Sequence, residues 1–155
     1  MRALEILEEV SLFSDLTMDE LALIAPLCKV IEGKAGDAII QEGERVQNVY
    51  ILLSGDATIK KAQAGGKLVQ IDQVRKDDLL GEVTFFKNTP ASATVVANSS
   101  FKALELSHKD LHRLLDDHPE LGLKIYKKFA RVLSVRIKKV LTRLVGYLPG
   151  AQSFS

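Results

Sequence analysis

This 155-residue sequence has little cysteine and no long apolar run, and each scarcity excludes a class of protein. The only cysteine, Cys28, can form neither an internal disulfide nor a four-cysteine zinc or iron–sulfur site. No apolar run approaches the roughly 20 residues that a membrane helix needs, and residues 1–10 are acidic and amphipathic, unlike a secretory signal. These absences predict a cytoplasmic protein with no membrane association.

Charge and composition argue against a nucleic-acid partner and for a globular domain. The 21 basic and 20 acidic residues give a net charge of +1, which provides no overall attraction to nucleic acid. A hydrophobic fraction of 46% with mixed charge is typical of a globular domain. One domain of this length buries about two-thirds of its unfolded surface.

The chain divides into three segments by pattern. Residues 1–27 predict N-terminal helices: Thr17 and Glu20 form a capping box, in which each side chain bonds the other's backbone N–H, and a helix from about Met18 to Ala25 should follow. Residues 28–106 contain short β-branched or alternating runs between glycine turns, which predict a sandwich or barrel. The expected strands are 28–31, 38–41, 48–53, 57–62, 67–74, 79–80, 93–97 and 101–106.

The third segment, residues 107–148, has a helical pattern. Ser107 is a candidate N-cap for a helix over 108–117, and Pro119 suits the first turn of a second helix. The second helix should run to about Val145, roughly 40 Å at 1.5 Å per residue. Three helix-ending residues follow it: Gly146, Pro149 and Gly150.

Residues 79–97, LLGEVTFFKNTPASATVVA, carry the most informative motif. A strand end, a glycine turn at Gly81 and a short helix over Val83–Phe86 are a common way to present backbone N–H groups to an anion. The stretch resembles the phosphate-binding cassette of cyclic-nucleotide-binding domains, G-E-[LA]-A, about six residues, then R-[TSA]-A-T-V. Gly81, Glu82 and residues 93–95 match it.

The resemblance extends from Leu12 to about Leu144. It includes the L-F-x-x-L-x-x-x-E-L lead-in from Leu12, the G-D-x-I-I-x-E-G motif at 36–43, and the strand 49–53 before a Ser-Gly turn. It implies a mainly β fold with flanking helices: an eight-stranded double-stranded β-helix (jelly-roll) with N-terminal helices and a long C-terminal helix. We therefore expect residues 1–155 to form a single domain.

The resemblance also implies a site. Glu82, which from the residues alone would be a solvated turn carboxylate, would accept a hydrogen bond from a ribose 2′-hydroxyl just after the Gly81 turn. The N–H groups of Glu82, Val83, Ser92 and Ala93 would surround the phosphate of a cyclic nucleotide, cAMP or cGMP.

Ala91 departs from the pattern, because the family has an arginine there. That guanidinium pairs with the cyclic phosphate, and losing such a partner costs roughly 2–5 kcal/mol, or about 30- to 4,000-fold in affinity. Lys87 is in the same loop but lies beyond the breaker Asn88-Thr89-Pro90. Weak or absent ligand binding is therefore expected.

The last helix is strongly basic. Over 119–145 it has eight basic residues against Glu120 alone, which leaves a net charge of about −6 on the rest of the chain. A solvated basic face is one interpretation. Its apolar positions repeat at four- and three-residue spacing and predict a seam for a second copy of the helix: Leu133, Ile137, Val140, Leu144 and Tyr147. The resemblance implies a dimer interface and a lid, with Arg136 near the purine. No helix-turn-helix follows, so no DNA-binding module is expected.

Catalysis and metal binding find little support. His108 and His112 are spaced i, i+4 and could share a metal, but no cysteine or third histidine completes the set, so an exposed polar face is expected. No nucleophile–base pair is present, and an enzyme is not predicted.

Two hypotheses of function remain. In the first, the domain is a sensor that binds a cyclic nucleotide or related small anion and signals through the C-terminal helix. In the second, the pocket is vestigial and the fold is a ligand-independent scaffold for a protein partner or for dimerisation.

Overall fold

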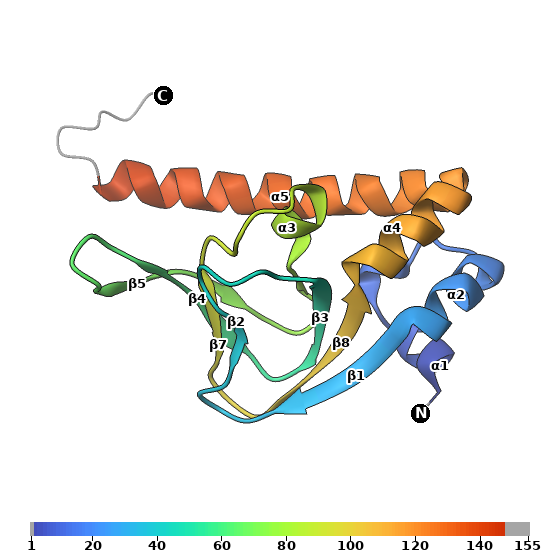
Figure 1. The fold of residues 1–155 in the computed structure, drawn as a ribbon, viewed down its shortest axis with the longest axis horizontal. Coiled ribbons are helices and arrows are strands. Elements are labelled where there is room, and N and C mark those ends of the chain that lie inside the picture. The colour runs from blue at the N-terminus through green and yellow to red at the C-terminus, as the bar shows by residue number, and fades with distance from the viewer. Residues whose placement is uncertain (1, 148–155) are drawn as a thin grey trace.

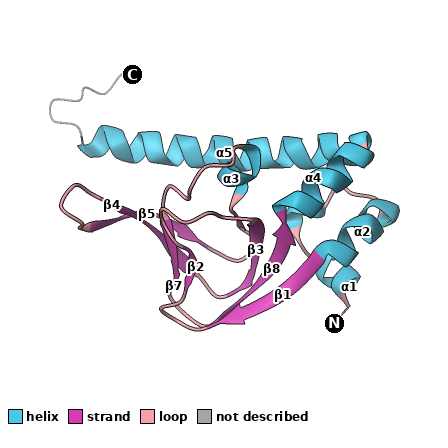
Figure 2. Cartoon of the chain, viewed as in Figure 1, coloured by secondary structure: helices cyan, strands magenta, loops and turns pink. Residues whose placement is uncertain are grey.

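Two antiparallel sheets and a group of helices make up the computed structural model, which describes residues 2–147. The helices gather at one end of the sheets, and the longest helix, α5 (Pro119–Tyr147), runs across the top of the molecule (Figures 1 and 2). The expected jelly-roll with flanking helices is confirmed. The position of Tyr147's side chain and residues 148–155, including the expected helix-ending Pro149 and Gly150, lie outside the described part.

The eight strands form two sheets of four. One sheet has the order β1-β8-β3-β6 and the other β2-β7-β4-β5, and every neighbouring pair is antiparallel. The strands are β1 (Cys28–Gly33), β2 (Ala38–Ile40), β3 (Asn48–Ser54), β4 (Ala57–Ala62), β5 (Leu68–Val74), β6 (Leu79–Leu80), β7 (Thr94–Ala97) and β8 (Phe101–Ser107). Each expected strand is present, with ends shifted by at most two residues.

Alternation along the strands separates two hydrophobic cores, because successive side chains point to opposite faces of a sheet. Ile51 of β3 and Leu104 of β8 face the helices, whereas their neighbours Leu52 and Ala103 face the interior between the sheets. In β6, Leu79 likewise faces the helices and Leu80 faces the interior between the sheets. The first sheet is therefore covered by helices on one side and by the second sheet on the other.

The helices pack on the first sheet. They are α1 (Ala3–Glu8), α2 (Met18–Ile24), α3 (Glu82–Phe86) and α4 (His108–Asp117), together with α5 and the short 3-10 helices Ser11–Phe13 and Ala25–Leu27. The capping box is present, since Thr17 Oγ1 accepts from the Glu20 N–H and the Glu20 carboxylate accepts from the Thr17 N–H. Ser107 caps α4 as expected.

Helix α5 changes surroundings along its length. Leu121, Ile125 and Phe129 are buried against the first sheet and the other helices. Beyond Ser134 the helix crosses above the roll, and its apolar side chains there are exposed. The expected stop at Gly146 is wrong by a residue: a side chain there would meet only open space, and one glycine costs a helix only about 1 kcal/mol.

The histidines of α4 also differ from expectation. His108 and His112 are half-buried and point at α3 instead of forming an exposed polar face. The reason is that α3 docks on α4, a contact between segments some 27 residues apart.

Residues 2–147 contain no candidate membrane-spanning helix and no candidate metal site. No described helix combines the length and apolarity needed to cross a membrane. Within the same residues, no three His, Cys, Asp or Glu side chains gather closely enough to hold a metal ion.

Candidate ligand-binding site

A sharp turn at Gly81 sets the geometry of the site. The φ angle of Gly81 is 80°, in the left-handed region, and an added Cβ would lie 2.5 Å from Asn48 O of β3. Only glycine fits both conditions. Thr84 Oγ1 donates to Gly81 O at 3.1 Å, so the chain turns at once from β6 into α3.

A cavity of about 430 Å³ lies between α3, the loop before β7, the inner faces of β4 and β5, and α5. Half of its lining residues are large aliphatic ones: Ile40, Val46, Ile59, Ile71, Leu80, Val83, Val95 and Val140. Its remaining lining residues are Lys61, Gly81, Glu82, Thr84, Ala91, Ser92, Ala93 and Arg136. We call this space the cassette cavity. The five residues expected to surround a ligand, Gly81, Glu82, Val83, Ser92 and Ala93, all line it.

Glu82 is the buried carboxylate of the cavity, only 3% exposed. Arg136 reaches down from α5 and binds it: one guanidinium nitrogen, Nη1, pairs with Glu82 Oε1, and the other, Nη2, donates to Leu79 O of β6. Charge-assisted bonds of this kind satisfy a carboxylate that burial would otherwise destabilise. Arg136, which the resemblance places near the purine, thus lines the cavity and holds α5 to the cassette in this structure.

Ala91, at the position of the family's arginine, is buried among the apolar residues inside the roll. Two cations line the cavity, and both have protein partners. Lys61 Nζ of β4 donates to Ser92 O at 2.7 Å and lies 3.8 Å from Glu42 Oε1, while Arg136 binds Glu82. An anion entering the cavity would therefore compete with existing contacts for either charge.

Lys61 is the lining residue that sequence reasoning missed. Lys87, the substitute considered from the sequence, does not line the cavity. The pairing of β4 with β7 places Lys60 opposite Thr94 and so brings Lys61 to the end of the loop that carries Ser92, just before β7. Nothing in the local sequence distinguishes Lys61 from Lys60.

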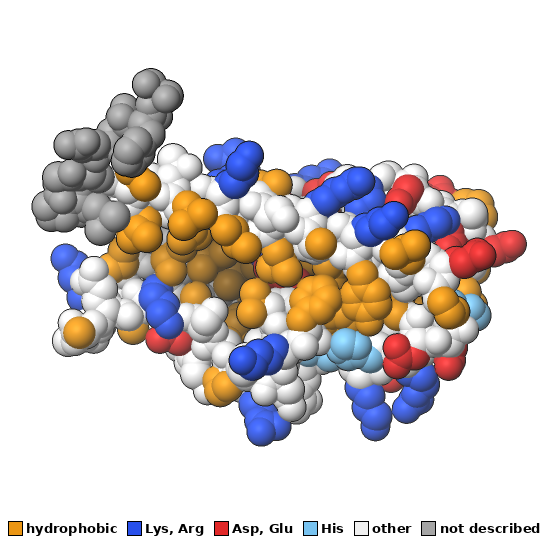
Figure 3. Space-filling view, turned by 90° about the horizontal axis from the view of Figure 1, so that it is seen from above, with side chains coloured by type: hydrophobic (Ala, Val, Ile, Leu, Met, Phe, Trp, Pro, Cys, Tyr) orange, Lys and Arg blue, Asp and Glu red, His pale blue; other side chains and the backbone are white. Residues whose placement is uncertain are grey.

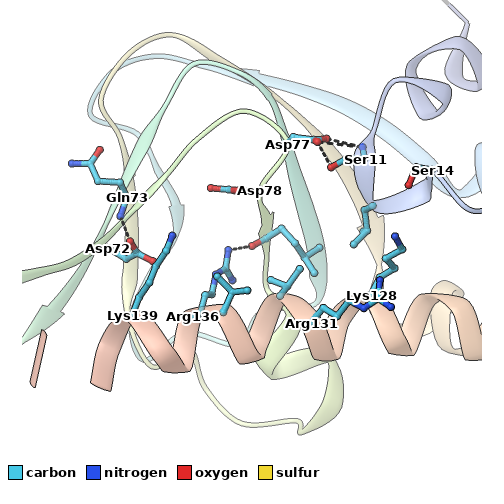
Figure 4. A pocket seen from close by; sticks show the side chains of 14 residues that line it. Ser11, Ser14, Asp72, Gln73, Asp77, Asp78, Lys128, Arg131, Arg136 and Lys139 are labelled. Carbon is cyan, nitrogen blue, oxygen red and sulfur yellow. Dashed lines mark hydrogen bonds between the residues drawn. The ribbon is translucent and has the colours of Figure 1, made fainter. Parts of the chain in front are cut away.

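A second cavity, of about 480 Å³, lies on the other flank of α5 (Figure 4). Basic side chains of α5, including Lys128, Arg131 and Lys139, line one side of this cavity. Carboxylates line the other side: Asp72 lies in β5, and Asp77 and Asp78 lie in the turn after it. Arg136 lines both cavities, and its guanidinium donates a hydrogen bond to Leu79 O (dashed in Figure 4). Arg136 is thus a side chain that the two cavities share.

The flank of α5 beside the cassette cavity is apolar. Viewed from above, hydrophobic side chains gather along the helix and around a hollow beside it (Figure 3). The exposed side chains of this α5 stripe are Ile137, Val140, Leu141 and Leu144, with Leu133 half-buried. Val83 and Phe86 of α3 are also exposed, and Phe86 packs its ring 5.9 Å from that of Tyr126 of α5. Three residues of the predicted seam, Ile137, Val140 and Leu144, are therefore exposed.

Comparison with known proteins decides the family. The sequence model of the cyclic nucleotide-binding domain matches residues 30–118, which contain the whole cassette. The chain belongs to the cyclic nucleotide-binding domain family. This agrees with the motif at residues 79–97.

Curated relatives with this domain include regulatory subunits of cAMP-dependent protein kinase. That of Aspergillus fumigatus is 36% identical over 109 residues, 70% of this chain and 26% of the relative, and that of Mycosarcoma maydis is 32% identical over 114 residues, 70% and 22% respectively. The chain thus spans about a quarter of the length of these relatives. A solved cyclic nucleotide-binding domain from Methylobacillus flagellatus shares 23% identity and the fold, with a TM-score of 0.83 over 96% of this chain and 83% of that one.

Proposed function

We propose that this cyclic nucleotide-binding domain is a regulatory, non-catalytic sensor whose cassette cavity takes a cyclic nucleotide or a related small anionic ligand weakly and signals through α5. The observation that carries the proposal is the Arg136–Glu82 ion pair. It joins the helix that would transmit a signal to the carboxylate that would meet a ribose hydroxyl.

The contacts of the cavity support weak binding. With Ala91 in the arginine position, a cyclic phosphate has no free guanidinium to meet, and the ammonium of Lys61 already bonds Ser92 O. A ribose hydroxyl that approaches Glu82 must displace Arg136. The ligand therefore has to exchange contacts instead of adding them, which reduces net affinity.

The same exchange supports signalling. A ligand that takes over Glu82 releases Arg136, and with it one of the contacts between the roll and the second half of α5. Among the described residues, the other ion pair along that half joins Arg143 to Asp72; it is longer, at 3.8 Å, and the Arg143 side chain is 45% exposed. Binding can shift α5 because it favours the state in which Arg136 is free.

Calorimetry with cAMP and cGMP, each to millimolar concentration, tests the proposal. The unsubstituted protein should bind one of them weakly, and Ala91→Arg should bind it about 30- to 4,000-fold more tightly. This range corresponds to the roughly 2–5 kcal/mol that a buried charge partner contributes to binding. Gln63→Arg is the matched control, because it adds the same charge in the exposed turn after β4. If neither cyclic nucleotide binds the unsubstituted protein or Ala91→Arg, the sensor function is wrong for these ligands.

The exposed apolar surface favours a second candidate, a dimerisation or protein-interaction scaffold. The α5 stripe with Val83 and Phe86 is suited to pack on a second copy of α5, and we propose a homodimer through it. Light scattering at tens of micromolar protein should give twice the monomer mass. Ile137→Asp should return the mass to that of a monomer, whereas Lys138→Glu, at the next exposed position, should not. A monomeric mass for the unsubstituted protein contradicts the dimer and leaves a different protein as the occupant of the surface.

A further inference from the structure

Two imidazoles of α4 contact the cassette helix α3 at its two ends. His108 Nε2 lies 3.1 Å from Gly81 O, the residue just before α3, and His112 Nε2 lies 2.7 Å from Phe85 O near the end of α3. A carbonyl oxygen only accepts hydrogen bonds, so Nε2 of each ring carries the hydrogen and donates it. The i, i+4 spacing places both donors on one face of α4.

The Phe85 carbonyl depends on this contact. In α3 the N–H of Phe85 donates to Gly81 O and that of Lys87 to Val83 O. The N–H of Thr89, which a longer helix would give to Phe85 O, bonds Lys87 O instead. Among the hydrogen bonds of the described residues, His112 supplies the donor to Phe85 O, and it therefore caps the C-terminal end of α3.

The rings reinforce the hydrogen bonds. The imidazole of His112 stacks on the ring of Phe85, with centroids 3.9 Å apart and planes 4° from parallel. His108 meets the same ring edge-on at 5.5 Å. Phe85 is buried in the core that the helices share. Each histidine thus binds α3 through its backbone and through its aromatic side chain.

A helix of five residues needs such support, because helix formation is unfavourable until several turns exist. We infer that His108 and His112 are positioning residues of the cassette cavity. By fixing both ends of α3 they set where Glu82, Val83 and Thr84 stand on the cavity wall. Their link to ligand binding rests on the function proposed above, while their effect on α3 does not.

Hydrogen exchange by NMR on the ligand-free protein tests the inference, read at the amides of Phe85 and Lys87. His112→Phe keeps the stacked ring and loses the donor, so both amides should exchange about tenfold faster, the value of one buried hydrogen bond. His112→Gln places an amide nitrogen where Nε2 stood and should restore protection to within about threefold. His118→Gln, at the exposed C-cap of α4, is the matched control and should change nothing.

Other patterns overturn the inference. Unchanged exchange in His112→Phe, or equal loss in the Phe and Gln variants, means that the donor does not position α3. Equal loss of protection in β3 and β8 means a general structural role. If His112→Phe does not fold, the nitrogen-15 shifts of the unsubstituted protein still decide, because the inference requires the Nε2–H tautomer for both rings and the Nδ1–H tautomer contradicts it.

Ligand affinity separates this inference from the proposed function. In the Ala91→Arg background, adding His112→Phe should weaken cAMP binding about tenfold, because the misplaced α3 moves Glu82, and adding His112→Gln should not. If cAMP does not bind Ala91→Arg at all, the proposed function is wrong, and the exchange rates still decide the role of the histidines. If cAMP binds Ala91→Arg and His112→Phe leaves its affinity unchanged, the positioning role toward the ligand is wrong.

Discussion

Removing the Arg136 guanidinium should destabilise the domain more than any other change to the exposed half of α5. Arg136→Met keeps the aliphatic length of the side chain but leaves the Glu82 carboxylate and the Leu79 carbonyl without their donor. Breaking a fully buried ion pair from one side costs about 3–5 kcal/mol. Because the Arg136 side chain is still 21% exposed, water offsets part of this cost, and we expect a loss of about 3 kcal/mol.

Urea unfolding followed by circular dichroism, at one protein concentration, measures this loss as a change in the free energy of unfolding. Arg131→Met is the control, because Arg131 is exposed on the same helix and makes no ion pair within the described residues; it should cost less than about 0.5 kcal/mol. Glu82→Gln removes the charge from the other side. The double variant should therefore be more stable than the sum of the single losses predicts, by about 1–3 kcal/mol.

Two results would refute this reasoning. If Arg136→Met and Arg131→Met lose equal stability, the Arg136–Glu82 pair does not hold α5 to the roll in solution. If the losses of the single variants simply add, the two side chains act independently, and the coupling between cassette and helix is wrong.

Three smaller predictions concern the frame of the site. Thr17→Ala removes the hydroxyl oxygen that accepts a hydrogen bond from the Glu20 N–H and should cost about 1 kcal/mol in urea unfolding; an unchanged midpoint contradicts the capping box. Gly81→Ala forces a side chain to φ 80° against Asn48 O and should cost at least about 1–3 kcal/mol, which a wild-type melting temperature would disprove. Burial lowers the pKa of His108 below its ordinary value, so the unfolded chain binds more protons as pH falls through the ordinary histidine range, and stability should fall with it. His108→Gln should flatten the pH dependence of the free energy of unfolding between about pH 7.5 and 5.5. If the variant and the unsubstituted protein lose stability equally over this range, His108 is not the group responsible.

The fold was largely predictable because its signals are local. Short β-branched or alternating runs marked the strands, glycine turns separated them, and the capping box at Thr17 started α2 where expected. The cassette residues Gly81, Glu82 and Ala93 were found because they are spaced along one short stretch, and they do line one cavity.

The contacts of the site were less predictable because they join distant segments. Arg136 is one of eight basic residues on α5, and only the crossing of α5 over the roll selects it as the partner of Glu82, 54 residues away. The burial of His112 likewise depends on α3 docking against α4, and Lys61 enters the cavity through strand pairing. A sequence pattern gives the periodicity of each element and not the rotation at which two elements meet.

The uneven packing of α5 gives the helix the geometry of a lever. Its fixed part ends near the buried Phe129, and the chain continues as a straight rod for about 27 Å to Tyr147, at 1.5 Å per residue. Arg136 lies only about 10 Å from that fulcrum. A tilt of about 10° that lifts Arg136 by about 2 Å, enough to break its hydrogen bonds, moves the helix end by about 5 Å. A displacement at Arg136 would thereby be more than doubled at Tyr147.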